Sequence, residues 1–287
     1  MNKKAVWFRL NQGTEIGVKT AGGVSDSDWV GDCIGQGTAG AALVSQVNLD
    51  QGLQQYFGDG EEDLKYGKVN LQPLAYQDNI MKGNKDVLSA QTGNIKLAAM
   101  LKEKGLEAHP DKTCYIICGS KRFKERAEND LKVNPLVFGT FPVKQHVSDK
   151  YLGQVIHSGG VESSATATVQ ERTGRIRGAT MEIKSIVEEF QMQSFGGLMA
   201  AHDLWERALI PSLLSGAGTW LGKSKEAIGL CDQLQNFYWG VILRVPESCP
   251  KVALRSETNI LGMKWRVWKQ KVLLLMRIRN HDQGTLC

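Results

Sequence analysis

Two kinds of hydrophobic pattern alternate along the first 160 residues. Apolar side chains recur three and four positions apart from about Thr38 to Tyr56 and again from Asp86 to Gly105, which is the spacing of one helix face. Asp86 suits the N-cap of the second helix, and Gly105 suits its C-terminal end. Stretches rich in β-branched and aromatic residues predict short strands, namely KVNLQPLAY, KTCYIIC, LVFGTFPV and KYLGQVI. This alternation is typical of an α/β layer.

The strand pattern fades after about residue 160, and helical spacing replaces it. Four windows carry this spacing, at 175–194, 198–214, 226–243 and 264–279. Prolines and a Ser-Gly-Ala-Gly run interrupt them. Five of the seven tryptophans lie in this part and are expected to help build its core. The sequence therefore predicts an α/β domain over residues 1–160 and a mostly α-helical domain over residues 161–287.

The composition is that of an ordinary soluble globular protein, with 42% hydrophobic and 23% charged residues. No apolar run approaches the roughly 18 residues that a membrane span needs, so no membrane partner is expected. The N-terminus has a basic start but no apolar stretch, which makes it a poor secretory signal. The six cysteines are scattered, without the paired spacing of a zinc site or the density of a disulfide scaffold. We therefore expect an intracellular protein, in the nucleus or the cytoplasm, with reduced thiols.

Positive charge is concentrated near the C-terminus. Residues 251–280 hold eight lysines and arginines against one acid, so this stretch carries +7 while the whole chain carries +5. Trp265 and Trp268 lie among these charges. Such a stretch can follow a phosphate backbone while the rings stack on bases, but it is also typical of a solvated helix face whose tryptophans pack inward. The residues alone leave both interpretations open.

Few side chains indicate catalysis by their spacing alone. Asp78, in the sequence Tyr-Gln-Asp-Asn, is either a metal ligand at a hairpin tip or only a turn residue, because Asp and Asn both stabilise tight turns. Cys114 and Cys118 lie on one face of a predicted strand, where packing is expected more than metal binding. The histidines show no helical pairing with acids or cysteines, and no Ser/His/Asp set can be argued, which disfavours a hydrolase.

Four short motifs occur in a fixed order along the chain. They are IGQGTAGAALVSQ at a helix start, LAYQDN in a hairpin, GLEAHPDKTCYIICG after a helix, and DKYLGQVIHSGG before the helical domain. Each is weak alone, but their succession on the predicted elements is informative. This succession resembles the palm and thumb of reverse transcriptases, most closely those of non-LTR retrotransposons, over nearly the whole chain. The resemblance implies an α/β (α+β) palm-like domain of right-hand polymerases, followed by a mostly α-helical thumb-like domain.

The resemblance also implies an activity, RNA-directed DNA polymerisation, in which dNTPs are added to a DNA primer on an RNA template by two-Mg²⁺ nucleotidyl transfer. Asp78 matches the first acid of the family's metal-binding signature, and Tyr76 matches its aromatic position. Asn79 occupies the place of the second acid. Lys112 matches a lysine near the leaving pyrophosphate. Asp78 and Lys112 are thus the implied catalytic residues, and Asp78 and Asn79 the implied metal ligands.

Further contacts with nucleotide and nucleic acid follow from the same resemblance. Gln36 and Gly37 match the pair beside the incoming nucleotide and the template, where a glycine permits close backbone approach, and Tyr76 lies in the same nucleotide site. The hairpin that grips the primer end is matched by Tyr151, Leu152 and Gly153. The residues expected to contact the nucleic-acid backbone are Lys264, Arg266, Lys269, Lys271 and Arg277.

Two departures from the family pattern bear on activity. No aliphatic run with Asp and Ala-Phe-Asp precedes Gln36, so we expect that the N-terminal part of the polymerase, with its first metal strand, is missing. Asn79 replaces the second acid, and its amide oxygen brings no charge to offset a dication. We therefore expect an incomplete two-ion site and little or no polymerisation by the chain alone.

Three functions are compatible with the sequence. The first is an RNA-directed DNA polymerase module that is active only within a longer protein. The second is a non-catalytic nucleic-acid binder whose basic helices hold a duplex. The third is a retroelement fragment without stable function, in which apolar surface left bare promotes aggregation.

Overall fold

The computed structural model describes most of the chain after residue 40 and four short strands before it. The described residues are 14–16, 19–20, 23–24, 28–30, 41–57, 64–66, 69–71, 73–76, 79–189, 195–220, 224–246 and 248–282. The chain forms two compact units. The first unit comprises Met1–Thr113 with Asp130–Val143, and the second comprises Cys114–Asn129 with Lys144–Cys287. The domain division expected at residue 160 stays a prediction.

Four short strands precede the helices of the first unit. They are β1 (Thr14–Ile16), β2 (Lys19–Thr20), β3 (Gly23–Val24) and β4 (Asp28–Val30). β1 pairs with β4 and β2 pairs with β3, both antiparallel. The four strands therefore form two two-stranded ladders, one nested within the other along the chain.

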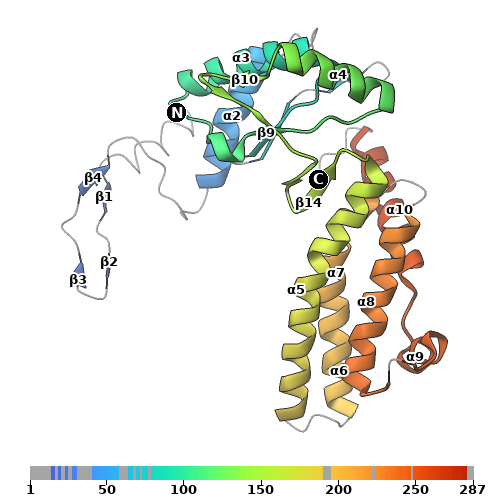
Figure 1. The fold of residues 1–287 in the computed structure, drawn as a ribbon. Helices are drawn as coiled ribbons and strands as arrows, with labels where there is room; N and C mark the ends of the chain where they lie inside the picture. The colour runs from blue at the N-terminus through green and yellow to red at the C-terminus, as the bar shows by residue number, and fades with distance from the viewer. Residues whose placement is uncertain are drawn as a thin grey trace. The chain divides into compact units, whose positions relative to one another are not determined.

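Two helices, α2 (Ala41–Phe57) and α3 (Val87–Glu103), carry the core of the first unit (Figure 1). They approach closely, because a Cβ at Gly52 would lie 2.8 Å from the sulfur of Met100. The buried apolar residues of this core are Leu49, Leu53, Phe57, Met100, Leu101 and Phe138. The small residue in α2 thus lets the long side chain of α3 fill the space between the two helices.

The ends of α3 follow from local sequence. Asp86 Oδ1 accepts a hydrogen bond of 2.7 Å from the Ser89 amide, and Ser89 Oγ accepts one of 3.1 Å from the Asp86 amide, which forms a capping box. At the other end Gly105 has a φ of 67°, and the Leu106 amide donates to the Leu101 carbonyl at 2.8 Å. This Schellman arrangement requires a residue that tolerates positive φ. The predicted N-cap and helix end are both confirmed.

Three hairpins complete the first unit. Their strands are β5 (Leu64–Tyr66) with β6 (Val69–Leu71), β7 (Leu74–Tyr76) with β8 (Asn79–Met81), and β10 (Val137–Phe138) with β11 (Phe141–Pro142). The stretch predicted as one strand, KVNLQPLAY, therefore contains two, β6 and β7. Pro73 lies between them, and its missing N–H prevents a continuous ladder.

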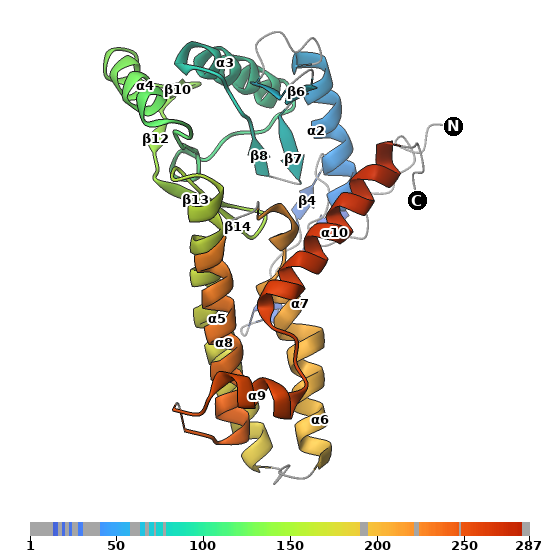
Figure 2. The same ribbon diagram turned by 90° about the vertical axis from the view of Figure 1, so that its right-hand side faces the viewer.

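The second unit is dominated by helices (Figures 1 and 2). They are α5 (Val161–Glu189), α6 (Phe195–Leu204), α7 (Ile210–Leu213), α8 (Lys225–Leu243), α9 (Lys251–Thr258) and α10 (Met263–Asp282), with a short 3-10 turn, η3 (Ala217–Thr219). α5 and α8 run side by side in both views. None of the described helices is long and apolar enough to cross a membrane.

Aromatic rings occupy the centre of this helical core. Trp205 stacks on Tyr238 with ring centroids 4.6 Å apart, and the Tyr238 hydroxyl donates to the Ala201 carbonyl at 2.7 Å. The core also includes Val169, Ile176, Leu213, Cys231, Leu234, Met263 and Val267. Burial of these rings contributes apolar area to the stability of the unit, and the buried Tyr238 hydroxyl keeps a hydrogen-bond partner.

Two features of these helices differ from the predicted windows. α5 begins at Val161, whereas the predicted window begins at 175. The prediction omitted the first turns because small residues are buried there, such as Ala165 and Thr168, and these give a weak hydrophobic pattern. The window 198–214 contains a π-helical turn, η2 (Trp205–Leu209), just before Pro211. Proline cannot donate to the carbonyl four residues earlier, and the Ile210 amide bonds instead to Trp205, five residues earlier.

Short strands and one further helix accompany the helices of the second unit. β9 (Cys114–Tyr115) pairs in parallel with β12 (Lys144–Gln145), and β13 (Ser148–Tyr151) pairs with β14 (Gln154–His157) in a tight hairpin. α4 (Lys121–Val133) begins among the residues of the second unit and ends among those of the first. It lay outside the predicted elements because its sequence is highly charged.

Candidate functional site

The residues implied as nucleotide and metal contacts are only partly described. Gln36, Gly37 and Asp78 lie outside the described residues. Tyr76 and Asn79 are directly paired at the end of the β7–β8 hairpin, and both are exposed. An exposed amide oxygen at such a position is chemically suited to a hard cation such as Mg²⁺, but it brings no charge. The two-ion site therefore stays a prediction.

Lys112 lies in the first unit, at the end of the 3-10 turn η1 (Pro110–Lys112), and is exposed. The turn is held locally, since the His109 ring accepts from the Asp111 amide at 3.2 Å and Thr113 Oγ1 donates to the His109 carbonyl at 2.8 Å. Tyr151, Leu152 and Gly153 belong to the second unit. The implied catalytic and primer-contacting residues are therefore split between the two units.

The β13–β14 hairpin turns at Leu152 and Gly153, which both have positive φ, 49° and 75°. Two consecutive positive φ values at the centre of a two-residue loop are typical of a type I′ turn, whose twist matches that of the strands. Glycine adopts this conformation without strain, whereas a leucine is disfavoured there. Leu152 is also 49% exposed, so no packing of an apolar side chain compensates fully for its backbone strain.

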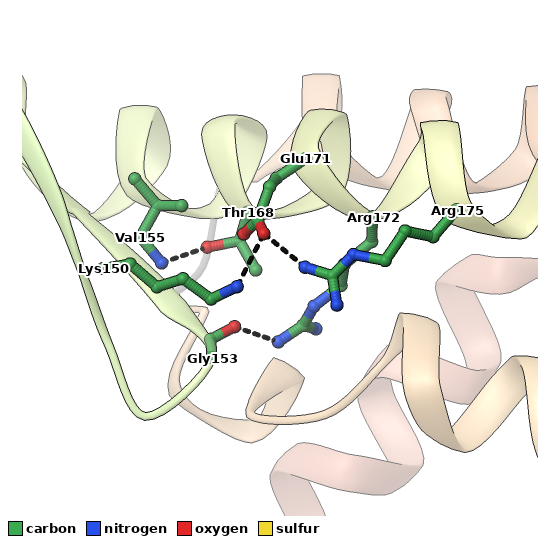
Figure 3. Close-up of polar contacts among 7 residues, drawn as sticks. All are labelled: Lys150, Gly153, Val155, Thr168, Glu171, Arg172 and Arg175. Carbon is green, nitrogen blue, oxygen red and sulfur yellow. Dashed lines mark hydrogen bonds and ion pairs between the residues drawn. The ribbon is translucent and has the colours of Figure 1, made fainter. Parts of the chain in front are cut away.

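The hairpin is fixed to α5 by Arg172 (Figure 3). The guanidinium donates to the Gly153 carbonyl at 2.6 Å, to the Leu213 carbonyl at 2.9 Å and to the Ser215 carbonyl at 2.8 Å. Leu213 is the last residue of α7, so the positive charge lies at a helix C-terminus whose carbonyls have no partner within the helix. Burial lowers the pKa of Arg172 from its usual value, and the nearby Glu171 opposes this effect. One buried side chain thus joins the hairpin, α5 and the loop after α7.

Side chains on both strands strengthen this attachment. Thr168 Oγ1 accepts from the Val155 amide at 2.8 Å, and Gln154 donates from its side-chain amide to the Ser215 carbonyl at 2.7 Å. On the outer side, Glu171 pairs with Lys150 at 2.6 Å and with Arg175 (Figure 3). The hydrogen bond from Lys150 is the main cause that lowers the pKa of Glu171. The hairpin is therefore held along its length, including the turn carbonyl of Gly153, while the Leu152 side chain stays half-exposed.

Replacing Leu152 by asparagine should raise the free energy of unfolding by about 1 kcal/mol, because asparagine tolerates the left-handed conformation that leucine resists. Urea denaturation followed by circular dichroism measures this change. Val147→Asn is the matched control, since Val147 is exposed but has no positive φ. If both variants change stability equally, the backbone of Leu152 is not strained.

Helix α10 presents the basic and aromatic residues of the C-terminal stretch. Trp265 and Trp268 are 61% and 59% exposed, and their rings meet edge to face with centroids 6.4 Å apart. The prediction that these tryptophans help to build a core is therefore wrong for this pair. Met263 and Val267 face the core instead, and both are buried. Lys264, Lys269 and Arg277 are exposed and Lys271 is partly exposed, so positive charges and rings share the outer surface of one helix.

Arg266 differs from the other basic residues of α10. Its guanidinium binds Glu206 with both terminal nitrogens, one of them at 2.7 Å, and its side chain is only 14% exposed. This paired geometry is the strong form of an arginine–carboxylate contact. Arg266 therefore connects α10 to η2.

A third group combines a thiol, an imidazole and a carboxylate in the second unit. The possible ligand atoms of Cys114, His146 and Asp149 all lie within 4.8 Å of one another. The Cys114 thiol donates to Asp149 Oδ2 at 3.1 Å. Burial, followed by this hydrogen bond, raises the pKa of Cys114 to about 12. Sequence spacing gave no signal for this group, because its members come from three separate strands or their ends.

No family model, curated protein or solved structure matches this chain.

Proposed function

We propose that this chain is the palm and thumb portion of a reverse transcriptase, an RNA-directed DNA polymerase of a retroelement, and that it binds a template–primer duplex. The observation that carries the proposal is the anchored β13–β14 hairpin, which corresponds to the primer grip of the resemblance. Its turn projects a strained, half-exposed Leu152 while Arg172 fixes the adjoining carbonyl of Gly153. Strain retained at an exposed turn is a recognised mark of a binding or catalytic site.

A primer grip needs this kind of support. The primer end must stay within a fraction of an ångström of its reactive position, which requires contact residues on a rigid frame. The hydrogen bond from Arg172 to Gly153 and that from the Val155 amide to Thr168 fasten the hairpin to α5, and Gln154 fastens it to the loop after α7. The proposed role of Tyr151 and Leu152 is to contact the primer strand next to its end.

The proposed contact with the duplex backbone lies on α10. Lys264, Lys269, Lys271 and Arg277 would neutralise phosphates, and Trp265 and Trp268 offer exposed ring faces. Both surfaces are joined to the same loop of the second unit. Ser215 accepts from the hairpin residue Gln154, and a Cβ at Gly218 would lie 3.1 Å from the Gln270 carbonyl of α10. The segment from Ser215 to Gly218 therefore contacts both the hairpin and α10, so the two proposed duplex contacts share one support.

In the proposed reaction, Gln36, Gly37 and Tyr76 would contact the incoming dNTP and the template, and Lys112 would lie near the leaving pyrophosphate. Asp78 and Asn79 would hold Mg²⁺. The chemistry that Mg²⁺ supplies when bound is neutralisation of charge on the reacting phosphates. Because Asn79 contributes no charge, we expect the chain alone to extend a primer weakly or not at all.

Binding and extension test the proposal separately. Anisotropy of a labelled RNA template annealed to a recessed DNA primer should report binding at low salt, and Leu152→Asn should weaken it severalfold while Val147→Asn leaves it unchanged. Primer extension with Mg²⁺ or Mn²⁺ should be weak and lost in Asp78→Ala. Absence of duplex binding would refute the proposal, and robust synthesis that survives Asp78→Ala would refute the catalytic assignment.

A non-catalytic nucleic-acid binder is the second candidate. The neutral Asn79 and the exposed basic and aromatic surface of α10 favour it, because neither feature requires a complete metal site. Duplex binding that responds to changes on α10, combined with no extension even in Mn²⁺, would support this candidate over the polymerase.

A further inference from the structure

We propose that Cys114, His146 and Asp149 form a binding site for one zinc ion, with a water molecule as fourth ligand. The ligand atoms lie within 4.8 Å of one another. In a tetrahedral zinc site with bonds of about 2.0–2.3 Å, neighbouring ligand atoms are separated by roughly 3.3–3.8 Å. The Cys114 sulfur and Asp149 Oδ2 lie 3.1 Å apart, and no pair in the group exceeds this range by more than about 1 Å.

Backbone hydrogen bonds hold the three positions together. β9 and β12 are parallel, with Cys114 opposite Lys144 and Tyr115 opposite Gln145. The His146 amide then donates to the Tyr115 carbonyl at 2.9 Å, which extends this register by one residue. Asp149 follows on β13, opposite Ile156 of β14. The three ligands therefore come from a frame of paired strands, and their convergence does not depend on a free loop.

The donor set favours zinc over other cations. Thiolate and imidazole are ligands of zinc and of other late transition metals, whereas Mg²⁺ and Ca²⁺ prefer oxygen alone. Cys114 and His146 are partly buried and Asp149 is exposed, so an ion and its water can reach the site. On binding, the S–H bond of Cys114 breaks, a sulfur–zinc bond forms and the proton leaves to solvent.

A nucleophilic role for Cys114 is the main competing explanation of the group. An activated thiol needs a depressed pKa and a base that removes its proton. Cys114 instead donates its thiol proton to the carboxylate of Asp149 at 3.1 Å. The same contact is compatible with a metal site, because a metal ion can take the place of the thiol proton between the Cys114 sulfur and the Asp149 carboxylate.

Zinc at this position would connect two parts of the second unit. It would tie the β9–β12 pair to β13, which belongs to the same hairpin as Leu152 and Gly153. The site uses neither of the implied Mg²⁺ ligands, Asp78 and Asn79. The proposal therefore stands whether or not the chain is a polymerase.

Titration of the reduced full-length chain with Co²⁺, followed by competition with Zn²⁺, tests the site. One equivalent of Co²⁺ should give the absorption of a thiolate–cobalt bond, and Zn²⁺ should displace it. Removing an outer partner of a metal site weakens binding by about 10–100-fold, so Cys114→Ser should weaken Zn²⁺ binding at least ~100-fold and abolish the thiolate absorption. Cys118→Ser is the matched control, because Cys118 is four residues away, exposed and outside the group.

Asp149→Asn provides a second variant at an exposed position, which should keep its fold and weaken Zn²⁺ binding at least ~10-fold. The proposal is overturned if the chain binds neither metal or if Cys114→Ser and Asp149→Asn bind Zn²⁺ as tightly as the original chain. Loss of binding in Cys118→Ser would likewise overturn it, because the ligand would then be a different thiol.

Discussion

Arg172→Met should lower the free energy of unfolding of the second unit by about 3–5 kcal/mol. The substitution keeps an apolar stem but removes the donors to the carbonyls of Gly153, Leu213 and Ser215. Arg172 is only 7% exposed, so water can replace these hydrogen bonds only in part. The Leu213 carbonyl is left without this partner in a buried position, which adds roughly 1–3 kcal/mol to the cost, whereas the Ser215 carbonyl keeps its hydrogen bond from Gln154.

Urea denaturation followed by tryptophan fluorescence suits this measurement, because five of the seven tryptophans belong to the second unit. Arg175→Met is the matched control on the same helix. Arg175 is 67% exposed and pairs with Glu171 at the surface, so its loss should cost no more than about 1 kcal/mol. Equal losses in the two variants would show that Arg172 does not hold the hairpin.

Combined replacement of Lys264 and Lys271 by glutamine should weaken binding of the template–primer by on the order of 10–100-fold at about 0.1 M salt. The two residues are seven positions apart on α10, so they lie on the same side of the helix with Trp268 between them. Each lysine that neutralises a phosphate releases about one counterion. The plot of log binding constant against log salt concentration should therefore become shallower by about 2.

The matched control is the pair Lys184→Gln and Lys225→Gln, which makes the same change of charge on α5 and α8. Its salt slope should stay within experimental error of the original chain. An unchanged slope in the α10 variant, or an equal change in the control, would contradict a backbone contact on α10. Circular dichroism of both variants should show helix content equal to that of the original chain.

Elements whose ends are fixed by contacts between residues close in the chain could be predicted from the sequence. The helix that starts at Asp86 is closed by contacts within three residues at its N-terminus and by a glycine with positive φ at its end. The hydrogen bonds that define this helix are local, so the pattern of residues contains the information that selects it. The stretch KYLGQVI, by contrast, was expected to be one strand, and the structure divides it at Leu152 and Gly153 into the two strands of a hairpin. Only the resemblance implied that hairpin.

Pattern alone was less informative where burial involves small or charged residues. The first turns of α5 were outside the predicted window because alanine and threonine give no strong hydrophobic periodicity, although they are buried against other elements. α4 and α9 were likewise outside the predicted windows. Trp265 and Trp268 were expected to pack in the core, but both are exposed. Pattern could not decide this, because an aromatic residue at helical spacing fits a core face and an exposed face equally well.

The sequence by itself determined the helices α2, α3, α8 and α10, the concentration of positive charge on the last helix and the succession of motifs. Only the tertiary structure decided that Arg172 supports the hairpin, that Arg266 pairs with Glu206, and that Cys114 meets His146 and Asp149. Periodicity reports contacts within a helix or strand, whereas these contacts join residues 19 to 60 positions apart, or residues on separate strands. Such partners are fixed by packing between elements, which a linear pattern does not specify.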